Sequence, residues 1–298
     1  MKLLVTGASG FIGSALVADL LRSGHEVRGV VRSDASSVRV SELGATPVAG
    51  GLEDPASLVT AANRVDGVVH LAFRHGSPLA EAAASDREAI EAIGESLAGS
   101  ERPLVITSGT LVLPAGPVGT EADRADPDAP AGARSEGERA ALALAGRGVR
   151  SAVVRLAPSV HDRVPRGFVG ALIDAARRSG FSDYIGSGEQ RWPAVHRQDA
   201  ARLFRRALES APAGAVLHGV GESGVTLRAI AERIGAHLEV PASAVPAEDA
   251  EEHFGWIAGL VGTDAPATSE RTQSLLDWKP THPGLLKDLD TGDFFAAR

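Results

Sequence analysis

The glycine spacing near the amino end is the feature that most constrains how this chain can fold. Residues 2–6 read KLLVT, an apolar run that predicts a short buried strand. This run leads directly into a turn with Gly7, Gly10 and Gly13, and apolar residues then follow at helical spacing. In such a unit the first glycine permits the tight turn, the second lets backbone N–H groups approach a pyrophosphate, and the third lets helix and strand pack closely. Because a helix N-terminus also favours anions, the pattern predicts dinucleotide binding.

Strands and helices alternate through the following residues. Further strands are expected near residues 24–32, 46–50, 67–73, 103–108 and 150–155, with helices near 55–63, 81–98 and 134–145. This alternation predicts an α/β fold, a Rossmann-type doubly wound parallel sheet. Residues 114–133 lack apolar periodicity and are predicted to form a long loop of the kind that binds ligands or closes over them.

The last third of the chain changes character. Helical segments are expected near residues 167–179, 199–209, 226–236, 248–260 and 269–276, with one strand at 215–220. We therefore expect residues 1–165 to form the dinucleotide-binding domain. Residues 166–298 are expected to form mostly a smaller C-terminal substrate-binding lobe, with some segments returning to the main sheet.

Composition excludes several classes of partner. The net charge is −8 and no run of lysine or arginine tracks a phosphate backbone, which argues against nucleic acid. The chain has no cysteine, so thiolate chemistry and cysteine-bound zinc are excluded, and we predict no metal site. Because no apolar run reaches the roughly 18 residues of a membrane span, we expect a cytoplasmic protein with no membrane partner. The oligomeric state is left open.

The end of the second strand indicates which dinucleotide is bound. NAD-binding folds of this kind place a carboxylate there for the ribose 2′-hydroxyl, but this chain has Arg32 and Ser33 before the first acid, Asp34. A guanidinium fork suits a phosphate. We therefore predict NADPH as the cofactor, with NADH as the alternative.

Other candidate residues lie at or just beyond the predicted strand ends, where ligands bind in open α/β sheets. Leu52 is placed either against the adenine or in the core, and Ala72 leaves room for the cofactor. We interpret His70 as a hydrogen-bonded core residue and His75, just beyond the strand, as a candidate substrate contact. The segment 107–110, with Ser108 and Thr110, points at the nicotinamide position. Trp192 and His196 in the C-terminal lobe are further substrate candidates.

A family resemblance rests on five segments, which occur along the chain in the family's order. They are the glycine motif at 6–13 and residues 66–72, 107–108, 155–160 and 192–199. Together they resemble the extended short-chain dehydrogenase/reductase family over nearly the whole chain. The resemblance implies that the segment around Val160 fixes the nicotinamide carboxamide. It also implies the following cofactor-contacting positions: Gly7, Ser9, Gly10, Phe11, Ile12, Gly13, Arg32, Leu71, Ala72, Phe73, Ser108 and Val160.

The chain departs from this family at its working dyad, Tyr-x-x-x-Lys. Alignment puts Gly132 at the position of the tyrosine and Glu136 at the position of the lysine. A one-register alternative puts Ser135 and Arg139 there, which supply a hydroxyl and a cation but no phenol. The single tyrosine, Tyr184, lies far from that place in the sequence. Gly109 aligns with the usual active-site serine, between Ser108 and Thr110. The chain thus resembles an atypical member, similar to Tyr-less antibiotic-pathway ketoreductases of the simocyclinone-type angucyclinone class.

The missing dyad does not exclude hydride chemistry. A positioned general acid raises the reaction rate about 10²–10⁴-fold. Holding the reactants in register lowers the activation barrier by roughly 7–11 kcal/mol. We therefore predict a ketoreductase acting on an aromatic, polyketide-like small-molecule ketone, with the proton from a substrate phenol or from solvent. Ser108 and Thr110 would only orient the carbonyl, and His75, Gly109, Trp192 and His196 are the candidate substrate contacts. Two alternatives stay open: a non-catalytic NADP-binding redox sensor or scaffold, and a nucleotide-sugar epimerase or dehydratase.

Overall fold

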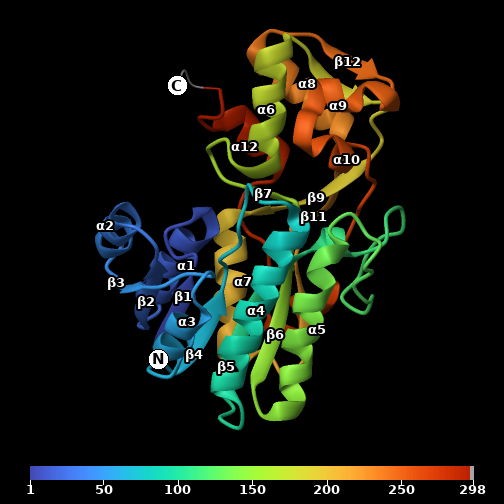
Figure 1. Cartoon of the computed structure of the whole chain (residues 1–298). Helices are drawn as coiled ribbons and strands as arrows, with labels where there is room; N and C mark the ends of the chain where they lie inside the picture. Colours follow the sequence, from blue (N-terminus) through green and yellow to red (C-terminus); the bar gives the residue numbers. More distant parts are fainter. Residues whose placement is uncertain (296–298) are drawn as a thin grey trace.

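A seven-stranded parallel sheet organises the molecule, as the sequence predicts (Figure 1). The structure is a computed structural model that describes residues 1–295. The spatial order of the strands is β10-β6-β5-β4-β1-β2-β3. Their bounds are β1 (Lys2–Thr6), β2 (Glu26–Val31), β3 (Thr46–Ala49), β4 (Gly67–His70), β5 (Pro103–Gly109), β6 (Arg150–Leu156) and β10 (Ala215–Gly219). Because the chain order reverses between β1 and β4, the ends of these strands frame the crevice where such sheets bind ligands.

Helices cover both faces of the sheet, so the central strands are buried on both sides. One face packs against α1 (Phe11–Arg22) and α7 (Arg197–Ser210). The other packs against α3 (Pro55–Ala62), α4 (Leu79–Leu97) and α5 (Ser135–Ala143). In Figure 1, α4 and α5 lie on the near side of the sheet and α7 behind it. A short helix, α2 (Asp34–Glu42), packs beside β2 and β3.

A smaller lobe stands over the carboxyl ends of these strands (Figure 1). It contains a three-stranded sheet of β7 (Ser159–His161), β9 (Arg191–His196) and β11 (Glu222–Thr226), and a pair formed by β8 (Ser182–Ile185) and β12 (Ala242–Val245). Its helices are α6 (Gly167–Ser179), α8 (Leu227–Leu238), α9 (Ala250–Phe254), α10 (Ala258–Val261) and α12 (Leu285–Thr291). A helix outside this group, α11 (Glu270–Leu276), packs on β10 and α7. The chain therefore passes from the main sheet to the lobe and back.

Most of the predicted elements form within a few residues of their expected bounds, but the lobe holds more strands than expected. The strands β7, β8, β9, β11 and β12 were not predicted, because each is short and has mixed polarity. The expected helix at 248–260 is interrupted at Gly255, whose φ of +57° lies outside the helical range. Within residues 1–295, no helix combines the length and apolar character needed to cross a bilayer.

Candidate active site

The turn between β1 and α1 admits only glycine at its critical positions. Gly7 has φ +67°, and a Cβ on Gly13 would lie 2.0 Å from the Gly7 carbonyl oxygen. The turn also touches the exit of β4, since a Cβ on Gly7 would lie 3.0 Å from the Ala72 nitrogen. The N-cap residue of α1 is Gly10, which has no side chain that could cap the first N–H groups of the helix. The first N–H groups of α1 are therefore available to an anion, and the cradle fits a dinucleotide pyrophosphate.

The three other predicted cofactor residues of the turn, Ser9, Phe11 and Ile12, are half-buried around this N-terminus. The Arg197 guanidinium makes a cation–π contact with the Phe11 ring, since its carbon lies 4.7 Å from the ring centroid. Arg197 also donates to the Ser14 hydroxyl at 2.6 Å. The first residue of α7 thus contacts the start of α1 beside the cradle.

Two arginines lie at the end of β2, where the adenosine ribose is expected. Arg32 is 68% exposed, and its guanidinium lies 3.8 Å from the Glu53 carboxylate. Arg74 lies 3.7 Å from the same carboxylate. Ser33 caps α2, because its hydroxyl accepts from the Ser36 N–H at 3.3 Å. Two guanidinium groups around one carboxylate form a place where a phosphate can substitute, which fits a 2′-phosphate.

Leu52 is 6% exposed and belongs to the apolar cluster under α3 and α4. Of the two roles left open by the sequence, this placement favours the core. At the end of β4, His70 is 1% exposed and lies within hydrogen-bonding distance of Thr6 at 3.0 Å and Asp86 at 3.1 Å. The prediction of a hydrogen-bonded core histidine is therefore confirmed. Leu71 and Ala72, just beyond it, donate their N–H groups to the Thr6 hydroxyl.

The end of β5 presents two buried hydroxyl groups. Ser108 is 3% and Thr110 is 2% exposed. Neither hydroxyl oxygen makes a hydrogen bond with any other residue of the range 1–295. Gly109, between them, is half-buried. An unpaired buried hydroxyl costs about 1–3 kcal/mol, and a hydrogen-bonding group placed at this strand end would compensate that cost.

Val160 in β7 is half-buried beside Ser159, whose buried hydroxyl is likewise without a partner in the described part of the chain. The β7 strand follows β6 and pairs with β9. This places the segment at the junction of the sheet and the lobe, as a carboxamide-fixing role requires.

The place of the missing dyad is structurally closed. A Cβ on Gly132 would lie 2.1 Å from the Pro127 carbonyl oxygen, so no larger side chain fits there without moving the loop. Glu136, at the lysine position, is exposed and pairs with Arg139 on the outer surface of α5. Ser135 is half-buried at the start of this helix. Neither sequence register therefore supplies a phenol or a buried cation.

Tyr184 lies in β8, within the pair of strands formed by β8 and β12 in the C-terminal lobe. The Arg228 guanidinium carbon lies 5.8 Å from its ring centroid. Tyr184 thus belongs to an element that does not join the seven-stranded sheet.

The fold brings to this strand end a further residue, Arg134, which sequence patterns alone do not single out. Its Nη2 donates to the Thr107 carbonyl at 2.7 Å, and its guanidinium carbon lies 4.3 Å from the Phe73 ring centroid. Phe73 also packs edge-on against His75, with ring centroids 5.3 Å apart. Desolvation of the His75 ring and then the Arg134 charge lower the His75 pKa. The sequence signal that could have identified Arg134 is a basic residue two positions before Glu136, which aligns with the family's lysine.

The two substrate candidates of the lobe differ in their surroundings. Trp192 is fully buried, and its indole N–H donates to the Thr263 carbonyl at 3.2 Å. This placement favours a core role, because the ring offers no face to a ligand. His196 is 7% exposed and stacks on His282 with ring centroids 4.5 Å apart. It lies 3.6 Å from Asp162, which also accepts from Arg197 at 3.0 Å.

His196 is part of a buried histidine cluster. Its ring is 5.5 Å from that of His161, whose Nδ1 lies 2.7 Å from the Asp288 carboxylate. Burial is the main cause that lowers the pKa of His161 to about 4, and burial also lowers the His196 pKa. The Asp288 pKa is raised, chiefly by burial.

Because of this cluster, we expect the free energy of unfolding to depend on pH in the acidic range. Because the folded state keeps His161 neutral, the unfolded state binds more protons between pH 6.5 and about 4. The free energy of unfolding should therefore fall as the pH falls through that window, by at most about 1.4 kcal/mol per pH unit. The raised Asp288 pKa opposes this slope, since above pH 3.8 the folded state retains that proton.

Urea unfolding of the protein at a series of pH values measures this slope. His161→Gln removes the titrating ring, and we expect its stability to depend less on pH across the window. The variant His237→Gln removes another, partly exposed histidine ring and is the control for the loss of a ring as such. Equal slopes in all three proteins would contradict the assignment to His161.

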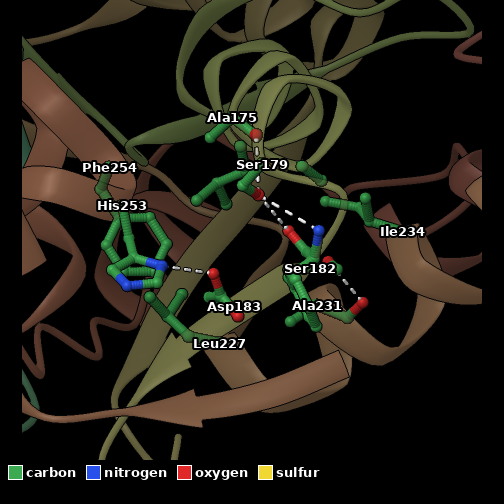
Figure 2. A pocket seen from close by; sticks show the side chains of 12 residues that line it. Ala175, Ser179, Ser182, Asp183, Leu227, Ala231, Ile234, His253 and Phe254 are labelled. Atoms are coloured by element: carbon green, nitrogen blue, oxygen red, sulfur yellow. Dashed lines mark hydrogen bonds and ion pairs between the residues drawn. The ribbon is translucent and has the colours of Figure 1, made fainter. Parts of the chain in front are cut away.

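Two cavities in the lobe region differ in size. Figure 2 shows the first, enclosed by α6, β8, α8 and α9, where His253 lies 2.6 Å from Asp183. Its volume of about 10 Å³ holds about one water molecule and no substrate. The second is an open groove of about 570 Å³ between the loop after β5 and α10, within the size range of ligand sites. Its lining residues are Pro114, Ala115, Asp126, Asp128, Ala129, Pro130, Gly259 and Leu260.

Comparison with known proteins gives a matching family, similar curated proteins and similar solved structures. Residues 3–218 match the NAD dependent epimerase/dehydratase family. An uncharacterized protein of Schizosaccharomyces pombe is 46% identical over 99% of this chain and all of its own length. A 4-hydroxy-2-methyl-3-oxo-4-farnesyl-3,4-dihydroquinoline-1-oxide ketoreductase of Stigmatella aurantiaca is 28% identical, covering 90% of this chain and 84% of that enzyme. Among solved structures, MoeE5 in complex with UDP-glucose and NAD superposes with a TM-score of 0.75 at 24% identity, covering 98% and 97% of the two chains, which shows a shared fold.

Proposed function

The chain belongs to the NAD-dependent epimerase/dehydratase family, and from this premise we propose that it is an NADPH-dependent ketoreductase. The proposed substrate is a ketone of an aromatic, polyketide-like compound. The pair of buried, unpartnered hydroxyls of Ser108 and Thr110 at the end of β5 carries this proposal. A ketone oxygen accepts hydrogen bonds from such groups and so compensates their desolvation.

The cofactor would be held by the cradle at the start of α1 and by the cations at the end of β2. When bound, NADPH supplies the hydride. The N–H groups of α1 hold the pyrophosphate, and Arg32 and Arg74 take the 2′-phosphate in place of Glu53. Half-buried Leu71, Ala72 and Phe73 line the exit of β4, where the small side chain of Ala72 leaves room.

The closed position at Gly132 supports a proton source outside the chain. Since the chain offers no phenol there, the proton would come from solvent or from the substrate. A phenol already hydrogen-bonded to the ketone places its acidic proton beside the developing alkoxide. A hydroxylated aromatic ketone is therefore the proposed substrate class. The similarity to the quinoline ketoreductase of Stigmatella aurantiaca supports the reaction type.

The two alternatives are less well supported. A nucleotide-sugar enzyme needs cations for a diphosphate, but Arg191 is engaged by Asp264 through two bonds, at 3.0 Å and 2.7 Å. Asp126 and Asp128 in the groove would repel such a substrate. A non-catalytic sensor has no need for a substrate-sized groove, and the groove between the loop after β5 and α10 measures about 570 Å³.

The ketoreductase proposal is tested by following NADPH oxidation with pairs of aromatic ketones. Each pair consists of an ortho- or peri-hydroxy ketone and its O-methyl ether. We expect turnover of the hydroxy ketones, about 100-fold or more faster than of the ethers, because only they carry the internal acid. Ser108→Ala combined with Thr110→Val should lower kcat/KM by about 100-fold. No NADPH oxidation across a broad panel, despite tight NADPH binding, would count against the proposal.

Cofactor preference gives a further prediction. Arg32→Ala should raise the Kd of NADPH by roughly 10- to 100-fold, the range for a hydrogen bond to a charged group, and leave the Kd of NADH unchanged. Fluorescence titration of each reduced cofactor measures both constants. Arg39→Ala, on the exposed side of α2, is the matched control. An equal loss of affinity for NADPH and NADH would contradict the phosphate assignment.

A further inference from the structure

We propose that Arg134 stabilises the oxyanion that forms when the ketone is reduced. This inference rests on the proposed function, since it assigns a residue to that reaction. Arg134 would donate a hydrogen bond to the carbonyl oxygen and supply positive charge where negative charge develops. It would thereby replace the electrostatic part of the missing dyad without acting as an acid.

The position of Arg134 supports this role. It is the last residue of a short 3₁₀ turn, Gly132–Arg134, that leads into α5. Its Nη2 donates to the Thr107 carbonyl at 2.7 Å, one residue before Ser108. Its guanidinium carbon lies 4.3 Å from the Phe73 ring centroid, at the exit of β4. The cation is therefore held between the ends of β4 and β5, at the edge of the sheet where ligands bind.

One donor of Arg134 is unused. The Nε atom is buried and finds no hydrogen-bond partner among the residues that the structure describes. The buried hydroxyls of Ser108 and Thr110 likewise have no partner in that part of the chain. Arg134 reaches the same strand end through its bond to the Thr107 carbonyl, one residue before Ser108. Each of these three groups can donate to an oxygen atom. A carbonyl oxygen that becomes an alkoxide would accept these donors most strongly after it gains charge.

The Arg134 charge is only partly compensated within the chain. Asp86, which is 3% exposed, lies 3.6 Å from Nη2. That carboxylate also lies 3.1 Å from His70 Nε2, so it is shared between two groups. On the other side, the Arg134 guanidinium packs over the Phe73 ring, which in turn packs edge-on against His75 in the loop after β4.

The reaction balances without a proton from Arg134. The carbonyl carbon accepts the hydride, and the C=O π electrons move to the oxygen, which the guanidinium N–H stabilises. The oxygen then takes a proton from the substrate phenol or from water, and solvent returns that proton to the donor. A guanidinium suits this task, because it remains protonated throughout.

The experiment uses a hydroxyanthraquinone dye whose phenol and phenolate absorb at different wavelengths. Bound at an oxyanion site, the dye phenol should ionise about one pH unit or more below its value in free solution. Arg134→Gln should abolish this shift and lower kcat/KM for ketone reduction about 100-fold, with the Kd of NADPH unchanged. Arg134→Lys should keep part of the shift. Arg139→Gln, on the exposed surface of α5, is the matched control and should behave as the parent.

Several outcomes would overturn the inference. A dye shift that survives Arg134→Gln would do so, as would a parent protein that binds the dye without shifting its ionisation. The second result needs no variant, so misfolding of Arg134→Gln leaves the test intact. A dye shift that depends on Arg134, without reduction of any ketone, would uphold the oxyanion site and refute the proposed reaction. Ketone reduction that persists in Arg134→Gln would uphold the proposed reaction and refute the role of Arg134.

Discussion

Replacing Gly13 with alanine is expected to raise the Kd of NADPH by about 100-fold, the effect of losing two charge-assisted hydrogen bonds of roughly 1.5 kcal/mol each. The added Cβ would lie 2.0 Å from the Gly7 carbonyl oxygen and 3.0 Å from the Ala8 Cα. Both contacts are to backbone, so no side-chain rotation relieves them. The start of α1 must then move away from the turn, and its N–H groups no longer converge on a pyrophosphate.

Fluorescence titration with NADPH measures this loss, and thermal unfolding shows whether the variant still folds. Gly146→Ala is the matched control, because a Cβ at Gly146 meets no atom within 4 Å. It should bind NADPH as tightly as the parent. A folded Gly13→Ala variant with parental affinity would show that the dinucleotide does not use this cradle.

The second large effect is expected at a buried ion pair between α5 and β6. The Arg155 side chain donates to the Glu138 carboxylate through Nε at 3.0 Å and through Nη2 at 2.8 Å, and both side chains are 2% exposed. Glu138→Ala would leave the arginine charge buried without its carboxylate. The expected loss is about 3–5 kcal/mol in the free energy of unfolding, or roughly 10 °C in Tm.

Urea denaturation and thermal unfolding of Glu138→Ala measure this loss. Glu136→Ala, on the same helix, removes an exposed pair with Arg139 and should cost no more than about 0.5 kcal/mol. Similar losses in the two variants would contradict the distinction between the buried and the exposed pair. Because Arg155 also donates to the Asp123 carbonyl at 2.8 Å, Glu138→Ala should loosen the loop that borders the groove as well.

Local patterns were sufficient for much of the fold. The strand, turn and helix at residues 2–22 could be predicted because glycine requirements and apolar periodicity act between near neighbours. The role of His70 followed from its place inside a buried strand. The five strands of the C-terminal lobe that went unpredicted are short and of mixed polarity, so only their pairing across the fold defines them. For example, β8 pairs with β12, about 60 residues later.

The candidate site divides in the same way. The sequence alone determined that a dinucleotide cradle is present and that no tyrosine stands at the family's catalytic position, because both depend only on which residues follow one another. Only the tertiary structure decided that the Pro127 carbonyl closes the position of Gly132, that Asp264 engages Arg191, and that Arg134 reaches the end of β5. These facts depend on side chains meeting across distant segments, where packing and charge select the partner.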